Sequence, residues 1–297
     1  MSLVIVGSIG LDSVSTPQED VNEVLGGSAV YGAVAGSHFC PTYIVGVVGT
    51  DFPMDSLKML QDNGVNLDGL VYKEGKTFRW IGKYNTWNRA ETLRTDLNVF
   101  ADFSPELPES CKCCKSLLLA NIHPGLQLQV LNQTSSYSHL ACDTMNYWIS
   151  LCPDELIQVL RRVDIVFMNE DEVRDWSGRR DIYSAARDVL ALGPQWVIVK
   201  RGEYGSVAIS SEYKFFAPAY PVEKVCDPTG AGDSFAGAFM AYLANFNLLK
   251  PALIKEAVRY GTILAALNVQ DFSVRSISAI ARAEIDLLKD NLVKWTS

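Results

Sequence analysis

Short runs of β-branched and other apolar residues alternate along this chain with stretches of helical periodicity, and this order restricts the fold more than any other feature. The apolar runs are residues 3–7, 43–48, 117–121, 140–144, 163–168 and 196–200. The helical patterns are residues 54–63, 153–162 and 182–192. Apolar strands separated by helices are typical of a parallel sheet covered on both faces. The sequence therefore predicts an α/β fold with a doubly wound, mostly parallel sheet flanked by helices.

The alternation changes in two places. Beyond residue 200, two β-like runs at residues 206–210 and 214–217 precede three helical patterns that end near residue 291. Earlier, residues 69–73, 77–84 and 91–95 resemble strands with no helix between them. Residues 77–84 change character at every position, which is typical of a half-exposed strand. We expect an inserted antiparallel flap here.

Composition favours one folded domain across residues 1–297, because 48% apolar and 20% charged residues can bury one large core. A net charge of −8 and a pI near 5.0 exclude nucleic acid or an anionic membrane as the main partner, since both need a basic surface. No apolar run approaches the roughly 18 residues of a membrane span, and the first residues carry no basic signal segment. We expect a cytoplasmic location.

The seven cysteines are odd in number and scattered along a chain too large to need disulfides, which also favours a reducing compartment. The cluster of Cys111, Cys113 and Cys114 suggests a metal site. However, no second pair follows at zinc spacing, and His123 is the only nearby histidine. We expect no structural zinc, and the sequence assigns the cluster no other role.

The segment most informative about function is residues 227–237, DPTGAGDSFAG. Its glycines and Asp233 fall where a turn becomes a helix, because Phe235, Phe239 and Tyr242 then recur at helical spacing. A helix start presents unpaired N–H groups and the positive end of a dipole, so an anion can bind there beside the carboxylate. An ordinary helix cap explains an isolated Gly-x-Gly-Asp equally well. The anion site and the adjacent base together suggest phosphoryl transfer.

With three further segments, this stretch resembles the PfkB family of carbohydrate and nucleoside kinases, the ribokinase-like group. The first is a double glycine followed by small residues, 26–35 (GGSAVYGAVA). The second is residues 169–172 (NEDE), similar to the family's Asn-x-x-Glu. The third is residues 200–205 (KRGEYG), similar to its nucleotide-side glycine turn. The segments lie in the family's order, and the resemblance spans residues 3 to about 270.

The resemblance implies a phosphotransferase that moves the γ-phosphoryl group of ATP to a hydroxymethyl group of a sugar, with Mg²⁺ and with a monovalent cation left open. The alternative acceptor is the ribose 5′-hydroxyl of a nucleoside. A β lid, formed by about residues 13–25 and 70–98, would cover the substrate and exclude water. The same segments could instead only extend the sheet or pair with a second subunit, so a homodimer through the lid is a further expectation.

Transfer to a hydroxyl needs a carboxylate that accepts the proton and donors for the charge on the phosphoryl oxygens. Asp233 is the predicted base. The backbone amides of Gly230, Ala231 and Gly232 are the predicted donors, because glycine permits the close approach of a phosphate.

The resemblance assigns ATP binding to Lys200, Gly202, Gly205 and Asn169, and a water-bound Mg²⁺ to Glu172. Lys200 and the two glycines follow a strand end, where ligands gather in open α/β sheets. Asn169 and Glu172 also fit a capping box of the following helix, and both explanations stay open.

For the acceptor, the resemblance implies that Asp12 binds sugar hydroxyls. It also implies that the substrate lies against the backbone of Gly26 and Gly27, and that Ser28 contacts a hydroxyl group. An ordinary surface turn is the alternative for Asp12. Two weaker candidates lie near the end of the run at residues 140–144: Asp143 within it and Asn146 just beyond it.

The chain also departs from the family. Tyr31 stands where many relatives have asparagine, and Trp148 stands near a position where many sugar-specific members have a basic residue. With Phe78, Trp80 and Trp87 in the flap, the pocket is expected to be more apolar than a simple sugar needs. A nucleoside acceptor would fit this, although the aromatic residues could equally form the core of the flap.

Two alternatives belong to other functional classes. In a serine hydrolase, residues 232–236 (GDSFA) would form a nucleophile elbow, whose usual motif they resemble. However, His38, His123 and His139 all precede Ser234, whereas the usual order puts histidine after serine. In a non-catalytic nucleotide-binding sensor, the same fold would bind ATP without releasing ADP.

Overall fold

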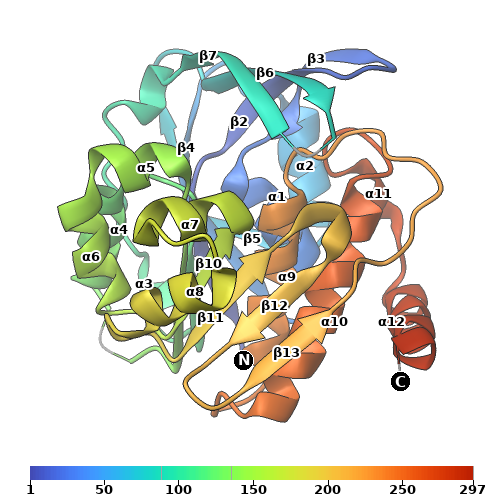
Figure 1. Cartoon of the computed structure of the whole chain (residues 1–297). Helices are drawn as coiled ribbons and strands as arrows, with labels where there is room; N and C mark the ends of the chain where they lie inside the picture. Colours follow the sequence, from blue (N-terminus) through green and yellow to red (C-terminus); the bar gives the residue numbers. More distant parts are fainter. Residues whose placement is uncertain (88, 135, 297) are drawn as a thin grey trace.

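The computed structural model describes residues 1–87, 89–134 and 136–296, and within them the chain forms a nine-stranded sheet in the order β13-β12-β11-β10-β9-β8-β1-β4-β5 (Figure 1). The strands from β11 to β5 pair in parallel, whereas β12 and β13 add an antiparallel edge. Their bounds are β1 Leu3–Val6, β4 Thr42–Gly49, β5 Val65–Lys73, β8 Ser116–Leu119, β9 His139–Asp143, β10 Ile165–Asn169, β11 Trp196–Lys200, β12 Ser206–Ile209 and β13 Lys214–Ala217. The predicted mostly parallel α/β sheet is confirmed.

Both faces of this sheet are buried. In β1 the side chains of Leu3 and Ile5 join one apolar cluster, and those of Val4 and Val6 join another. Successive side chains of a strand point to opposite faces, so the two clusters are the two halves of the core. Helices α1, α9 and α10 cover the first face, and α4, α6 and α8 cover the second.

The helices lie between the strands in sequence, as a doubly wound sheet requires. Their bounds are α1 Ser28–Ser37, α2 Met54–Asp62, η1 Asn98–Phe100, α3 Glu109–Lys112, α4 Pro124–Leu131, α5 Asn146–Leu151, α6 Pro153–Leu160, α7 Glu170–Ser177, α8 Ile182–Leu190, η2 Gly202–Tyr204, α9 Ala231–Leu243, α10 Pro251–Asn268, α11 Arg275–Ala279 and α12 Arg282–Thr296. Among the described residues, none of these helices combines the length and apolar character needed to cross a lipid bilayer.

A second sheet lies at one end of the large sheet, in the order β3-β2-β6-β7 (Figure 1). Its strands are β2 Gly10–Ser15, β3 Asp20–Gly26, β6 Phe78–Thr86 and β7 Arg89–Asp96. The outer pairs are antiparallel, and the central pair, β2 and β6, is parallel.

The prediction that residues 69–73 belong to the inserted flap is wrong, because they form the end of β5 in the large sheet. β5 pairs in parallel with β4 from Val65 onward, so residues 70–73 extend the main sheet. A Cβ added at Gly69 would lie 2.7 Å from the carbonyl oxygen of Ile44, which shows how closely the two backbones approach. The chain leaves for the second sheet only after Gly75, whose φ of 122° favours glycine.

Helices α1 and α9 touch backbone to backbone. A Cβ added at Gly237 would lie 2.0 Å from the carbonyl oxygen of Gly32, and one added at Gly36 would lie 3.4 Å from the Cβ of Ala241. Both contacts advance in the same direction along the two helices, so α1 and α9 run side by side from the same end. The glycine-rich segments at their N-termini, residues 26–27 and 230–232, are therefore neighbours.

Candidate active site

Several of the predicted site residues lie at the edge of the large sheet where its parallel strands end. Asn169 is the last residue of β10, Lys200 is the last residue of β11, and the two are register partners. Asp143 ends the adjacent strand β9. This edge is where open α/β sheets bind ligands. Asn146, the other weaker candidate, lies beyond the edge in α5 and donates to Asp175 instead.

The N-terminus of α9 is built around glycine. Gly230 is its N-cap with a φ of 75°, and a Cβ there would lie 2.2 Å from Cγ of Tyr31, so only glycine fits. The N–H groups of Gly230 and Gly232 have no acceptor within the described residues, which leaves them available to an anion. The Ala231 N–H donates to the carbonyl oxygen of Pro228 at 3.2 Å, and its role as a phosphoryl donor stays a prediction.

Asp233 lies in the first turn of α9 and is half-buried. Burial, together with the charge of Asp143, raises the pKa of Asp233 to about 7, although Lys200 acts in the opposite direction. A catalytic base works best when its pKa is near the working pH. The environment of Asp233 therefore suits the predicted role of proton acceptor.

We expect kcat/KM to rise with pH through the pKa of Asp233. Only the ionised carboxylate accepts a proton, so with a pKa of about 7 the rate should fall tenfold per pH unit in acid and level off in mild alkali. Initial rates measured from about pH 5 to about pH 9 would check this. A flat profile over that interval would exclude a base with this pKa.

Lys200 brings a positive charge to this acidic site. Its Nζ is 2.6 Å from Oδ2 of buried Asp143 and would lie 3.1 Å from a Cβ at Gly232. Burial lowers the pKa of Lys200, but the charges of Asp143 and Glu172 outweigh it and hold this pKa above its usual value. Lys200 therefore stays protonated next to the N-terminus of α9, where it can attract an anion.

Asn169 and Glu172 form the capping box of α7. The Asn169 side chain accepts from the Glu172 N–H at 2.8 Å, and the Glu172 carboxylate accepts from the Asn169 N–H at 2.7 Å. Burial raises the pKa of Glu172 to about 8, while the charge of Lys200 opposes this. Both residues thus have a structural role. The Glu172 carboxylate also lies close enough to Lys200 to raise the pKa of that lysine.

The glycine turn after β11 has its own structural reasons. Gly205 has a φ of 83°, and a Cβ there would lie 2.0 Å from the carbonyl oxygen of Ala217 in β13. Gly202 begins η2 with a φ of 54°. Backbone geometry alone therefore requires glycine at Gly205 and favours it at Gly202, and an ATP contact for either one stays a prediction.

On the acceptor side, Asp12 is buried in β2, and burial, followed by the charge of Asp227, raises the pKa of Asp12 to about 7. A Cβ at Gly26 would lie 1.9 Å from Oδ2 of Asp12, so only glycine leaves room for this carboxylate. Gly27 has a φ of 98° and caps α1. The Oγ of Ser28 accepts from the backbone N–H of Ser8 at 3.2 Å, which ties it to the end of β1 rather than leaving it free.

The sequence reasoning missed a contact between the second sheet and the segment before α9. Thr229 Oγ1 donates to the Tyr84 hydroxyl oxygen in β6 at 3.2 Å. Next to it, Asp227 is buried; its Oδ1 accepts from the Thr229 N–H, whereas Oδ2 has no partner in the described part of the chain. The alternation of residues 77–84 indicated a half-exposed strand, but it did not identify a partner for Tyr84.

The aromatic residues of the second sheet pack within the protein. Phe78 lies edge-on against Phe100 with ring centroids 5.7 Å apart. Trp80 packs against the cluster that contains Val14 and Tyr84, and its Nε1 donates to Thr92. Their presence is therefore explained by packing and gives no independent support for an apolar substrate pocket.

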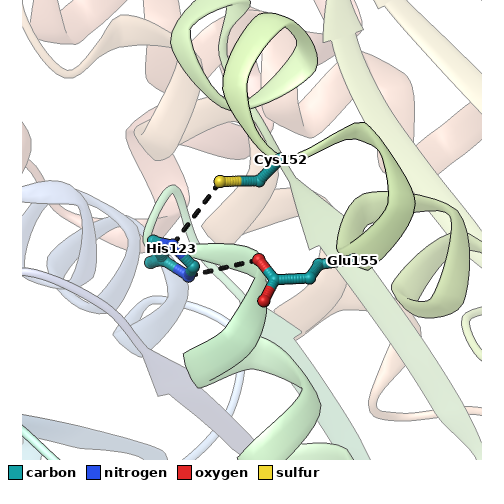
Figure 2. A group of neighbouring side chains, drawn as sticks. All are labelled: His123, Cys152 and Glu155. Carbon is teal, nitrogen blue, oxygen red and sulfur yellow. Dashed lines mark hydrogen bonds and ion pairs between the residues drawn. The ribbon is translucent and has the colours of Figure 1, made fainter.

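One group of metal-binding residue types lies outside this site. Figure 2 shows His123 between the thiol of Cys152 and the carboxylate of Glu155. The thiol is 3.5 Å from Nε2, whereas the carboxylate is 3.8 Å from Nδ1, which also accepts from the Gly125 N–H at 2.9 Å. One possible ligand atom from each of the three side chains lies within 4.8 Å of the other two, so the group is compact enough for an ion, and Nδ1 of His123 already accepts from Gly125. His123 serves as the N-cap of α4.

The hydrolase alternative is wrong. Ser234 is fully buried, and its hydroxyl donates to Asn268 at 3.2 Å. His38 and His139 bond to backbone carbonyl oxygens of Ile277 and Phe246. A nucleophilic serine needs a histidine at its hydroxyl and access to substrate, and Ser234 has neither in the described residues.

Solved structures with the same arrangement of two sheets are ribokinase-like proteins. A nucleoside kinase of Methanocaldococcus jannaschii superposes with a TM-score of 0.80 at 18% identity, and each chain is covered to 98%. Ribokinase II of E. coli in complex with ATP and Mg²⁺ superposes with a TM-score of 0.78 at 21% identity, covering 98% of this chain and 99% of the other. These likenesses establish the ribokinase-like fold.

The chain belongs to the pfkB family of carbohydrate kinases, whose family model matches residues 4–281. It is also 30% identical over 269 residues to a cytidine kinase of Thermococcus kodakarensis, covering 88% of this chain and 93% of that protein. The protein is therefore a kinase of this family, as its sequence motifs indicated.

Proposed function

We propose that this kinase transfers the γ-phosphoryl group of ATP to the ribose 5′-hydroxyl of a nucleoside. The observation that carries the proposal is the half-buried Asp233 carboxylate beside the free N–H groups of Gly230 and Gly232. Similarity to a cytidine kinase along most of the chain favours a nucleoside over a free sugar. A sugar hydroxymethyl group is the second candidate, because Asp12 beside Gly26 offers a carboxylate that suits any polyol.

In this mechanism Asp233 accepts the proton of the acceptor hydroxyl as its oxygen attacks the γ-phosphorus. The N–H groups of Gly230 and Gly232 and the ammonium of Lys200 donate to the phosphoryl oxygens, where negative charge develops. Asn169, Gly202 and Gly205 would line the ATP side.

The oxygen donors present fit Mg²⁺, which prefers carboxylates and water. Glu172 would hold the hydrated ion, and the ion would neutralise charge on the phosphates of ATP. Burial raises the pKa of Glu172 to about 8, so the bound ion would have to offset that burial to keep the carboxylate ionised. A monovalent cation stays a prediction, and the unpaired Oδ2 of Asp227 is compatible with one.

We further propose that residues 1–297 form one domain in which the sheet of β2, β3, β6 and β7 acts as a lid. The hydrogen bond between Tyr84 and Thr229 supports this, because it joins that sheet to the segment before α9. A closed lid would keep water from competing with the acceptor. A homodimer through the edge strands of the lid stays a prediction.

A coupled ADP-release screen with Mg²⁺ and ATP would test the function. We expect release with cytidine or another ribonucleoside, and much slower release with free ribose, fructose or glucose. Faster turnover of a free sugar would move the assignment to the second candidate. Binding of ATP without ADP release in the presence of any acceptor would leave the nucleotide-sensor alternative instead.

A further inference from the structure

Three side chains of types that bind metal ions meet outside the kinase site. His123 is the N-cap of α4, Cys152 is the N-cap of α6, and Glu155 lies in the first turn of α6. The side chains of an N-cap and of the third helical residue lie close together at a helix start. Figure 2 shows the thiol and the carboxylate on either side of the imidazole. The fold thereby joins two helix starts whose residues are 29 positions apart in sequence.

Each of these three side chains interacts with the other two. The Cys152 thiol lies 3.5 Å from Nε2 of His123, and a Glu155 oxygen lies 3.8 Å from Nδ1. Burial, the charge of Glu155 and a hydrogen bond to its carboxylate raise the pKa of the Cys152 thiol. One ligand atom from each side chain lies within 4.8 Å of the other two, so the three atoms form a closed triangle.

We propose that His123, Cys152 and Glu155 bind one divalent cation of the zinc type, at a site separate from the Mg²⁺ that serves ATP. Imidazole, thiolate and carboxylate are the ligand types that zinc takes in proteins. The site uses none of the cysteines in the cluster at residues 111–114, where zinc spacing is absent. The proposal does not depend on the kinase function.

The spacing of the ligand atoms fits such an ion. Bond lengths of about 2.3 Å to sulfur and about 2.0 Å to nitrogen, at a tetrahedral angle, separate these two ligand atoms by about 3.5 Å. The observed distance between Sγ of Cys152 and Nε2 of His123 is 3.5 Å. A carboxylate oxygen of Glu155 would supply the third ligand, and water would take the fourth position.

The surroundings leave the group accessible on one side and hold it on the other. The side chains of His123 and Glu155 keep 42% and 44% of their surface exposed, so an ion can reach them. Trp148 packs edge-on against the imidazole with ring centroids 5.1 Å apart, and its Nε1 donates to Asn121 at 2.9 Å. Such outer contacts fix the orientation of a metal ligand.

Binding of the ion changes the protonation of two groups. The Cys152 thiol must lose its proton, and the positive ion offsets the negative charge of Glu155 that opposes this loss. Coordination through Nε2 puts the ring proton of His123 on Nδ1, so the bond from the Gly125 N–H to Nδ1 is given up. One helix-cap hydrogen bond is a small cost beside the binding of zinc by thiolate and imidazole.

The test measures Zn²⁺ binding to the metal-free full chain, without ATP and with a phosphine reductant, by competition with a chromophoric chelator. We expect the wild type to bind a single ion. Cys152→Ser should bind it at least about 10²-fold more weakly, because loss of an outer contact alone costs about 10–100-fold. His123→Asn keeps a good helix cap without the imidazole and should show a similar loss. Cys113→Ser, at an exposed cysteine outside the site, is the matched control and should bind as the wild type does.

Two further measurements identify the ligands and the state that binds. Co²⁺ bound to the wild type should show thiolate-to-metal charge-transfer absorption, and Cys152→Ser should lack it. Zn²⁺ should raise the Tm of the wild type but not that of Cys152→Ser, because an ion that binds only the folded chain stabilises it.

The site is overturned if the wild type binds no Zn²⁺ or if Cys152→Ser binds it with unchanged affinity. Charge-transfer absorption that persists in Cys152→Ser and disappears in Cys113→Ser would place the ion at the cysteine cluster instead. Both results would leave the kinase function intact, since that function is measured separately by ADP release with Mg²⁺.

Discussion

Asp233→Asn is expected to lower kcat by roughly 10²–10⁴-fold while leaving the affinity for ATP nearly unchanged. Asparagine keeps the size and shape of the side chain but cannot accept the proton of the acceptor hydroxyl. Asp233 is half-buried in the first turn of α9, so the neutral side chain should not disturb the helix. Steady-state ADP release measures kcat, and calorimetric titration measures ATP binding.

Asp62→Asn is a suitable control, because Asp62 is an exposed residue at the end of α2, away from the sheet edge described above. It should behave as the wild type does. Turnover of Asp233→Asn within about twofold of the wild type would mean that another group removes the proton.

Lys200→Met should have the second largest effect. It removes the cation that faces Asp143 at 2.6 Å and lies beside Gly232. Loss of one preorganised donor to the phosphoryl oxygens is expected to lower kcat by about 10²-fold or more. Because Asp143 would remain buried without its partner, the free energy of unfolding should also fall by about 3 kcal/mol or more.

A double variant separates the two effects. Combining Lys200→Met with Asp143→Leu replaces the ion pair by apolar side chains, which often restores stability. We expect chemical denaturation to show recovery of the unfolding free energy, while ADP release stays low. Recovery of both together would mean that Lys200 acts only through the fold.

The large sheet could be predicted because its signal is local. Leu3 to Val6 are apolar at every position, and all four side chains are fully buried, as expected for a strand covered on both faces. Residues 69–73 were assigned to the wrong sheet because an edge strand has an exposed side and resembles the half-polar strands of the second sheet. Helix α4 was missed, since its apolar residues are not confined to one face.

In the site, the sequence predicted the features that depend only on residues close together in the chain. The glycines and Asp233 lie next to each other in the segment that starts α9, so their juxtaposition needed no tertiary information. The bond between Thr229 and Tyr84 joins residues 145 positions apart and depends on how the second sheet folds over. The donation from the Ala231 N–H to Pro228 depends on turn geometry that residue types do not specify.

The backbone contact of Gly32 with Gly237 limits how this enzyme can diversify. Helices α1 and α9 are held as one unit, because a side chain larger than hydrogen at Gly237 would clash with the carbonyl oxygen of Gly32 and push the helices apart. The distance between Gly27 and Gly230, the N-caps of the two helices, is thereby set by the main chain. Substrate preference must then change through side chains around the site or through the outer sheet, while the N-termini of α1 and α9 keep their relative position.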